Sequence, residues 1–146
     1  MLSVRIRRLR PSVRLPEYQT PGAAGFDLAA SEDVVVAPRA VALVPTGLVI
    51  RVPDGYFLGI FARSSTPVRR GLIVANGVGV IDVDYCGATD EIKIQVLNVT
   101  DQPVTVRAGD RIAQGLFIPV ARASWKETNE DLRAGSRGGF GATGEC

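Results

Sequence analysis

The chain has 146 residues, 46% of them hydrophobic and 22% charged, which predicts one folded domain with a single core. It contains no histidine, so a Ser-His-Asp triad, a Cys-His dyad and a His-ligated zinc or haem are excluded. The net charge is only +2, which argues against a general nucleic-acid or membrane coat. Any catalytic chemistry therefore has to come from other residue types, above all from carboxylates and arginine.

The few cysteines and lysines narrow the chemistry further. Cys86 and Cys146 are too few for an all-cysteine zinc site, and they are typical of free thiols in a reducing compartment, a disulfide between them being the alternative. Because Lys93 and Lys126 are the only lysines, nearly all positive charge lies on guanidinium groups, which suit bidentate contact with phosphate. No apolar run has the length to cross a bilayer, and no signal peptide is recognisable. We therefore expect a cytoplasmic protein without a membrane partner.

The first predicted element is a strand at the N-terminus. The first sixteen residues carry five arginines and no acid, a composition that would also suit a mitochondrial presequence. Leu2, Val4 and Ile6 alternate with polar residues, which favours a half-exposed strand instead.

Further short segments, rich in β-branched residues and separated by Gly and Pro turns, are predicted to be strands. In chain order they are residues 26–29, 33–36, 40–44, 47–52, 56–61, 72–74, 79–81, 91–99, 104–106 and 112–120. The pattern is clearest where Ile92, Ile94 and Val96 fall on one face of a strand. One short helical turn after Arg63 is the best helix candidate, and Pro67 limits its length. The chain is therefore predicted to be all-β, as a sandwich, jelly roll or distorted barrel.

The composition changes near the C-terminus. From Ser124 the apolar pattern stops, and residues 135–144 are rich in glycine, which divides the chain into a β-barrel domain (1–123) and a flexible arm (124–146). Gly139–Gly144 matches G-x-G-x-x-G, but no helix or βαβ unit surrounds it, which argues against a dinucleotide site. The arm is either a disordered tail or a lid that orders over an anionic ligand.

Three internal segments carry residues suited to phosphate chemistry. Arg63 and the two serines after it follow a predicted strand, where they suit phosphate binding, although a serine there is also a common helix N-cap. In Gly79–Gly87 an apolar strand ends at Asp82 and is followed by Tyr85, although an aspartate at such a place is usually a turn former. Gln114 lies among apolar residues and needs a hydrogen-bond partner.

Five segments together resemble, in order and with family-like spacing, the motifs of the trimeric deoxyuridine triphosphatase (dUTPase) family. They are Gly22–Leu28, Ala62–Ser65, Gly79–Gly87, Gly109–Gln114 and Gly138–Gly144. The resemblance implies a distorted jelly-roll β-barrel, a homotrimer with sites at subunit interfaces, and Mg²⁺-dependent hydrolysis of dUTP to dUMP and pyrophosphate. Such an enzyme would limit uracil incorporation into DNA and supply dUMP for dTMP synthesis.

The resemblance also implies roles for individual residues. Asp82 would be the base that activates the water attacking the α-phosphate, and Tyr85 would pack against the deoxyribose and exclude a 2′-hydroxyl. Asp27 would support Arg63, and Mg²⁺ would be held by the triphosphate and water rather than by protein ligands. The residues expected to bind substrate are Arg63, Ser64, Ser65, Asn76, Val80, Ile81, Tyr85, Lys93, Gln114, Arg137, Phe140 and Thr143.

This chain departs from the family pattern in three places. Ala88–Asp90 is added before the strand that begins near Glu91, in the hairpin whose backbone reads uracil. Cys86 stands where the family tends to have a polar or basic residue, and Pro67 interrupts the usual short helix. In the arm, the family's arginine falls on a glycine, so Arg137 is assigned to the γ-phosphate and Arg133 is the alternative.

Three other functions are alternatives to the dUTPase prediction. The related dCTP deaminases share the fold, but their catalytic glutamate is replaced here by Gln95, a neutral amide that cannot act as a general acid-base group. A non-enzymatic nucleotide sensor on the same scaffold is a second alternative, because a fold does not fix a function. A nucleic-acid module is disfavoured because the N-terminal arginines lack interleaved aromatic residues.

Overall fold

The structure is a computed structural model that describes residues 2–139. Its elements in chain order are β1 (Arg5–Arg8), β2 (Phe26–Ala29), β3 (Val34–Val36), β4 (Val41–Pro45), β5 (Leu48–Arg51), β6 (Tyr56–Ala62), α1 (Ser65–Arg70), β7 (Leu72–Val74), β8 (Gly79–Ile81), β9 (Lys93–Asn98), β10 (Val104–Val106) and β11 (Arg111–Pro119). The prediction of an all-β fold is confirmed. Within the described residues, no helix has the length and apolar character of a membrane span.

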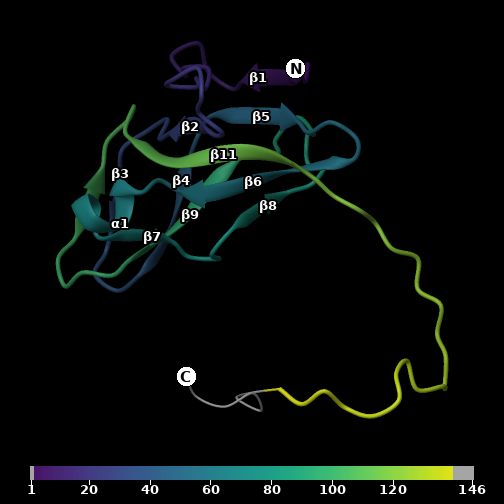
Figure 1. The fold of residues 1–146 in the computed structure, drawn as a ribbon. Helices are drawn as coiled ribbons and strands as arrows, with labels where there is room; N and C mark the ends of the chain where they lie inside the picture. The colour runs from purple at the N-terminus through teal and green to yellow at the C-terminus, as the bar shows by residue number, and fades with distance from the viewer. Residues whose placement is uncertain (1, 140–146) are drawn as a thin grey trace.

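The strands pair in four antiparallel sheets around one core (Figure 1). The largest has the order β2-β11-β6-β8, beside a sheet β4-β9-β7 and the two-stranded ribbons β1-β5 and β10-β3. Ile50, Val106, Leu58 and Ile94 come from the four sheets, are at most 1% exposed and belong to one apolar cluster. Burial of side chains like these, at about 25 cal/mol per Å² of apolar surface, is the main force that holds the sheets together.

Most strands lie where the alternation of apolar residues predicts them. The bounds of β2, β7, β8 and β10 are those predicted, and the remaining strands differ from prediction only near their ends. The largest changes are at β1, which begins at Arg5 rather than near Leu2, and at β9, which begins at Lys93 rather than at Glu91. Ile92 donates its N–H to the Leu48 carbonyl (2.9 Å), so this part of the chain bonds to β5 before it joins β4.

The predicted helical turn after Arg63 is the six-residue helix α1. Pro67 is tolerated because it lies in the first turn, where a backbone N–H has no partner within the helix. Gly71 ends the helix in a left-handed conformation (φ 65°) and donates to the Pro67 carbonyl. A Cβ at this position would lie 2.1 Å from the Thr100 side chain, so both the backbone angle and the close packing require glycine.

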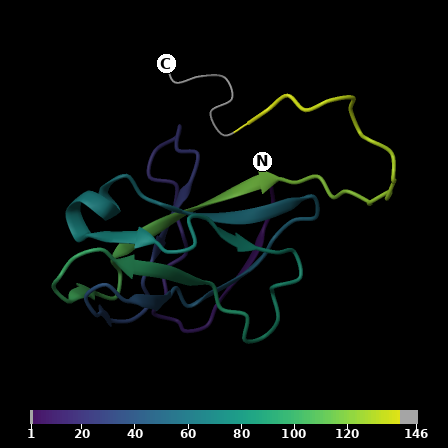
Figure 2. The ribbon, with the colours of Figure 1, turned by 90° about the horizontal axis from the view of Figure 1, so that it is seen from below.

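After β11 the chain leaves the body of the domain. Val120 donates to the Gly55 carbonyl (2.9 Å), and residues 120–139 then form neither helix nor strand. Figures 1 and 2 show this segment running away from the sheets in both views. It carries two large apolar side chains that are almost fully exposed, Trp125 (93%) and Leu132 (92%).

Candidate active site

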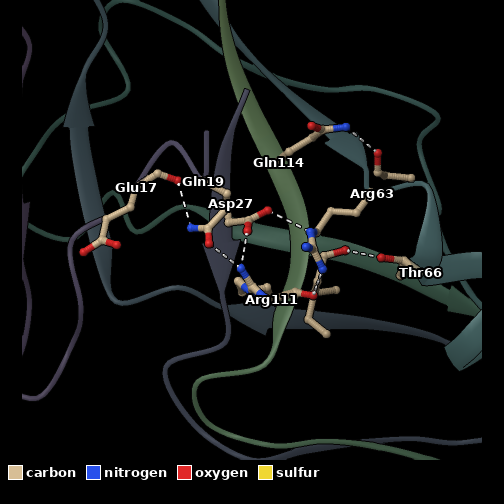
Figure 3. A network of polar contacts seen from close by, with 9 residues as sticks. Glu17, Gln19, Asp27, Arg63, Thr66, Arg111 and Gln114 are labelled. Carbon is tan, nitrogen blue, oxygen red and sulfur yellow. Dashed lines mark hydrogen bonds and ion pairs between the residues drawn. The ribbon is translucent and has the colours of Figure 1, made fainter. Parts of the chain in front are cut away.

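Asp27 lies at the centre of a polar cluster on the largest sheet (Figure 3). One carboxylate oxygen pairs with Nε of Arg63 at 2.7 Å, and the other pairs with Nη1 of Arg111 at 3.0 Å. The Asp27 side chain is only 11% exposed. Gln19 accepts a hydrogen bond from the same Arg111 nitrogen at 2.7 Å. Strand pairing produces the cluster, because β2 and β6 lie on either side of β11.

The Asp27 cluster holds two guanidinium groups with one carboxylate. The Arg63 and Arg111 side chains are 27% and 46% exposed, so each keeps donors that face solvent. A guanidinium has five N–H donors, and the two ion pairs fix the orientation of both planes before any ligand arrives. The cluster therefore carries a surplus positive charge that suits an anion such as phosphate.

Ser64, Ser65 and Gln114 lie on the elements next to this cluster. Ser64 occupies the N-cap position of α1, yet its hydroxyl makes no capping hydrogen bond. Gln114 of β11 donates to the Ala62 carbonyl at 3.0 Å, which supplies the partner that its surroundings require. Thr66 docks α1 on β11 through a hydrogen bond from its hydroxyl to the Ile112 carbonyl at 2.9 Å.

The turn that leads into β11 is braced by two carboxylates with lowered pKa values. A hydrogen bond from Arg70 holds the pKa of Asp110 below its ordinary value, and the backbone N–H of Ala108 does the same for the pKa of Asp33. Asp110 contacts Arg70 at 2.7 Å, and it also accepts from the N–H of Arg107 at 2.9 Å. These bonds connect α1 to the turn that delivers Arg111 and Gln114.

A second group of candidate residues lines a cavity of about 440 Å³ beyond the end of β8. Its walls are formed by Leu43, Val80, Ile81, Asp82, Tyr85, Thr89, Glu91 and Lys93. The Tyr85 hydroxyl donates to the main-chain carbonyl of Glu91 at 3.1 Å, and the ring is 41% exposed. A volume of this size suits a nucleoside or another small molecule.

The Ala88–Asp90 segment forms a closed turn at the edge of this cavity. Asp90 accepts a hydrogen bond from the Gly87 N–H at 2.6 Å and donates its own N–H to the Gly87 carbonyl at 3.3 Å. Arg7 of β1 donates to the Ala88 carbonyl. Thr89 thus joins the cavity wall from this turn.

Most of the predicted site residues belong to one of these two groups, and the two groups share no residue. None of Arg63, Ser64 or Gln114 lines the cavity that contains Asp82 and Tyr85. Their roles in substrate binding and catalysis stay predictions.

Four other predicted residues belong to neither group. Asn76 is exposed in the turn between β7 and β8, and Arg137 is exposed in the segment after β11. Phe140 and Thr143 lie outside the described residues.

Arg111 was not assigned a role from the sequence. It lies within the segment Gly109–Gln114, but a register shift between Arg111 and Ala113 interrupts the strand alternation, so its side-chain direction could not be inferred from a period of two. The available signal was its position beside Asp110, at the start of a strand that also carries Gln114.

Within residues 2–139, no group of three or more acidic or cysteine side chains could hold a metal ion. Asp27, the carboxylate of the first cluster, is already paired with two arginines. That Mg²⁺ is held by the triphosphate and water stays a prediction.

Comparisons with known proteins match nearly the whole chain to one family. The family model described as dUTPase matches residues 12–144. The deoxyuridine 5′-triphosphate nucleotidohydrolase of Thermobifida fusca is 47% identical over 144 residues, covering 97% of this chain and 78% of that protein. The corresponding protein of an Anaeromyxobacter species is 43% identical and covers 98% of each chain.

Solved structures agree with these sequence matches. The dUTPase from Streptococcus mutans superposes with a TM-score of 0.76 at 36% identity, covering 85% of this chain and 100% of that one. The dUTPase of Staphylococcus bacteriophage 80alpha with dUPNHPP superposes with a TM-score of 0.86 at 24% identity, covering 99% and 100% of the two chains. At that identity the second likeness supports the fold alone.

Proposed function

Because this chain belongs to the dUTPase family, we propose that it hydrolyses dUTP to dUMP and pyrophosphate. The observation that carries the proposal is the cavity of about 440 Å³ that places Asp82 and Tyr85 on one wall. A carboxylate and an aromatic ring beside a space of nucleoside size suit the activation of water next to a bound sugar.

Asp82 is the proposed base. A carboxylate can accept a proton from water without a histidine. The water oxygen attacks the α-phosphorus, the bond from that phosphorus to the bridging oxygen of the β-phosphate breaks, and pyrophosphate leaves. Tyr85 packs against the deoxyribose, while Val80, Ile81 and Lys93 line the space for the nucleotide, with Asn76 nearby on the preceding turn.

The Asp27 cluster is the proposed phosphate side of the site. Arg63, held by Asp27, binds phosphate together with Ser64, Ser65 and Gln114. Mg²⁺ bound to the triphosphate would neutralise part of the charge on the phosphate oxygens. The arginines then supply fixed donors at the phosphates, so the protein contributes mainly positioning and electrostatic stabilisation.

The proposal includes a homotrimer of distorted jelly-roll barrels whose sites are shared between subunits. Its support is that the two groups of site residues lie apart on one chain, and that Leu43 and Val80 beside the cavity are 54% and 58% exposed. Residues 1–123 form the barrel domain, and the arm 124–146 reaches a neighbouring site. There Arg137 contacts the γ-phosphate, with Arg133 the alternative, while Phe140 closes over uracil and Thr143 adds a donor.

We assign this activity to the cytoplasm, where the thiols stay reduced. Hydrolysis of dUTP would lower the amount of uracil that polymerases insert into DNA, and the dUMP formed would serve as a precursor of dTMP. No nucleic acid or membrane partner belongs to the proposal.

The test is an assay of the purified chain with Mg²⁺ and, in separate reactions, dUTP, UTP, dTTP and dCTP. We expect dUMP and pyrophosphate from dUTP alone and loss of that activity in Asp82→Asn. Ammonia from dCTP would instead indicate a deaminase, which the amide of Gln95 disfavours. No product from any nucleotide would leave a binding protein as the function.

A further inference from the structure

The segment that carries Asp82 and Tyr85 is not part of any sheet. Residues 82–92 connect β8 to β9 without strand pairing, so the barrel does not fix them through ladder hydrogen bonds. Two local hydrogen bonds close the turn, from the Tyr85 N–H to the Asp82 carbonyl (3.3 Å) and from the Cys86 N–H to the Asp84 carbonyl (3.0 Å). These bonds shape the turn but do not attach it to the rest of the molecule.

Arg51 attaches this turn to the barrel. Its guanidinium, at the end of β5, donates from Nη1 to the main-chain carbonyl of Val83. The same nitrogen lies 3.9 Å from the Cys86 sulfur, and Nη2 contacts Asp54 at 3.4 Å. One side chain therefore reaches both arms of the turn.

Val83 is the point where the turn meets the core. Its side chain packs against the central apolar cluster, and its carbonyl is the acceptor for Arg51. Asp82 precedes it and Tyr85 follows two residues later, both exposed. The peptide group between Val83 and Asp84 thus fixes the backbone orientation from which both functional side chains project.

Other contacts hold the rest of the segment, and within the turn the Cys86 thiol shares the Val83 carbonyl with Arg51 at 3.6 Å. Arg7 holds the Ala88 carbonyl, and Glu91 accepts from the Gly47 N–H at 2.7 Å. Both bonds lie downstream of Cys86. Upstream, Ile81 is the last residue paired in β8.

We propose that Arg51 is a positioning residue that holds the Asp82–Tyr85 turn, and hence the Asp82 carboxylate, in its reactive orientation. The inference rests on the proposed function, in which Asp82 activates water. It assigns a role in the reaction to a side chain that lies outside the five family-like motifs and does not line the cavity. Displacement of a catalytic group by about 1 Å can cost on the order of 100-fold in rate.

The experiment compares Arg51→Met, which removes every donor, with Arg51→Lys, which keeps one charged donor. We expect Arg51→Met to lower kcat for dUTP by about 10- to 100-fold while KM changes by less than about 3-fold. Arg51→Lys should recover much of kcat, because an ammonium group can also donate to the Val83 carbonyl. The thermal unfolding midpoint is measured for every variant.

Two matched controls test whether a fall in kcat comes from the loss of the Val83 bond or only from the loss of a charge or an ion pair nearby. Arg5 is the direct cross-strand partner of Arg51 on β1, so Arg5→Met removes the same charge from the same face. Asp54→Asn removes the charge of the Arg51–Asp54 ion pair and leaves the Val83 bond. Both controls should keep the parent kcat.

The outcomes are separable from those for the proposed function. A wild-type kcat in folded Arg51→Met, or an equal loss in Arg5→Met, overturns the inference. If Arg51→Met does not fold, Arg51→Gln replaces it, and failure of both to fold assigns Arg51 to stability alone and also overturns the inference. If the wild-type chain in the same series forms no dUMP from dUTP, the proposed function is wrong, and if Asp82→Asn keeps its activity, Asp82 is not the base. An inactive Asp82→Asn beside a fully active Arg51→Met contradicts only the role of Arg51.

Discussion

The two groups of candidate site residues are held in place by different kinds of contact. The Asp27 cluster consists of side-chain ion pairs on paired strands, with a carboxylate that is 11% exposed. The Asp82–Tyr85 turn is exposed; Arg51 donates to its Val83 carbonyl, and its own Tyr85 hydroxyl donates to the Glu91 carbonyl. One substitution at Asp27 therefore breaks several contacts at once, whereas the turn can lose one contact and retain the others.

This difference favours separate roles for the two groups, phosphate binding for the cluster and recognition of the nucleoside for the turn. A rigid pair of guanidinium groups suits phosphate, whose charge and geometry are the same in every nucleotide. A turn held at a few points can adjust to a sugar and a base, and it is where selectivity between nucleotides would arise. The Asp27 cluster and the Asp82–Tyr85 turn could act together within one chain or across two chains, and mixing of variants distinguishes these arrangements.

The largest expected effect is the rescue of activity by mixing two inactive variants. Asp82→Asn removes the base and Arg63→Ala removes the phosphate donor, so each alone should be nearly inactive. If sites are shared between subunits of a trimer, co-refolding equal amounts should restore about a quarter of the wild-type rate, because one in four interfaces then pairs two intact halves. Assays of dUTP hydrolysis before and after mixing measure this directly.

The matched control for the mixing experiment uses two variants from the same group. Asp82→Asn and Tyr85→Ala both damage the turn. Every subunit in this mixture therefore has a damaged turn, and no interface can combine an intact turn with an intact cluster. No rescue is expected from this pair. If Asp82→Asn and Arg63→Ala also fail to rescue each other in subunits shown to exchange, the site lies within one chain.

The next largest effect is expected at Asp27. Asp27→Asn leaves two partly buried guanidinium groups without a counter-charge, and we expect unfolding free energy to fall by about 2 kcal/mol. We also expect kcat/KM for dUTP to fall by about 100-fold, because Arg63 loses the ion pair that orients its guanidinium group. Urea denaturation and steady-state kinetics test the two effects separately.

Asp101→Asn is the control for Asp27. It breaks an ion pair with Arg39 in which the side chains are 64% and 81% exposed, and such pairs contribute about 0.2–1 kcal/mol. Both stability and activity should stay close to those of the parent. An Asp27→Asn variant that behaves like Asp101→Asn would remove the basis for treating the cluster as a fixed phosphate site.

A smaller effect is expected from Tyr85→Phe. The change removes only the hydroxyl that donates to the Glu91 carbonyl, so the ring stays but is less firmly placed. Loss of one such hydrogen bond, about 1–1.4 kcal/mol, should reduce the preference for dUTP over UTP by roughly 10-fold. The ratio of kcat/KM values measures it, with Tyr56→Phe on β6 as the control, and an unchanged ratio would show that the ring needs no such support.

Much of the fold was predictable from the sequence because alternation reports directly on burial. Ile92, Ile94 and Val96 were expected on one face, and all three are fully buried. Gln114 was expected to need a partner, and it donates to the Ala62 carbonyl. These predictions depend on local pattern and on the rule that buried polar groups are hydrogen-bonded.

The contacts that join distant segments were not predictable in the same way. Arg51 and Val83 are 32 residues apart, and Gly47 and Glu91 are 44 residues apart, so no local pattern connects them. The acceptor in the first pair is a main-chain carbonyl, which every residue has and which leaves no mark in the sequence. The separation of the two site groups likewise follows from sheet order, which the sequence alone did not fix.

The smallest effect is expected at the ion pair between Asp110 and Arg70, which holds the turn before Arg111. The hydrogen bond from Arg70 lowers the pKa of Asp110 below its ordinary value of 3.8, so the folded state favours the ionised carboxylate. The stability from this group is therefore present above pH 3.8 and is lost as the pH falls through the lower pKa of the folded state. Asp110→Asn should reduce unfolding free energy by about 1 kcal/mol at neutral pH, with the difference shrinking as the pH falls from 3.8 through the folded-state pKa. Urea titrations across this range test it beside Asp131→Asn in the exposed segment after β11, and a difference that does not change with pH would exclude titration of Asp110 as its cause.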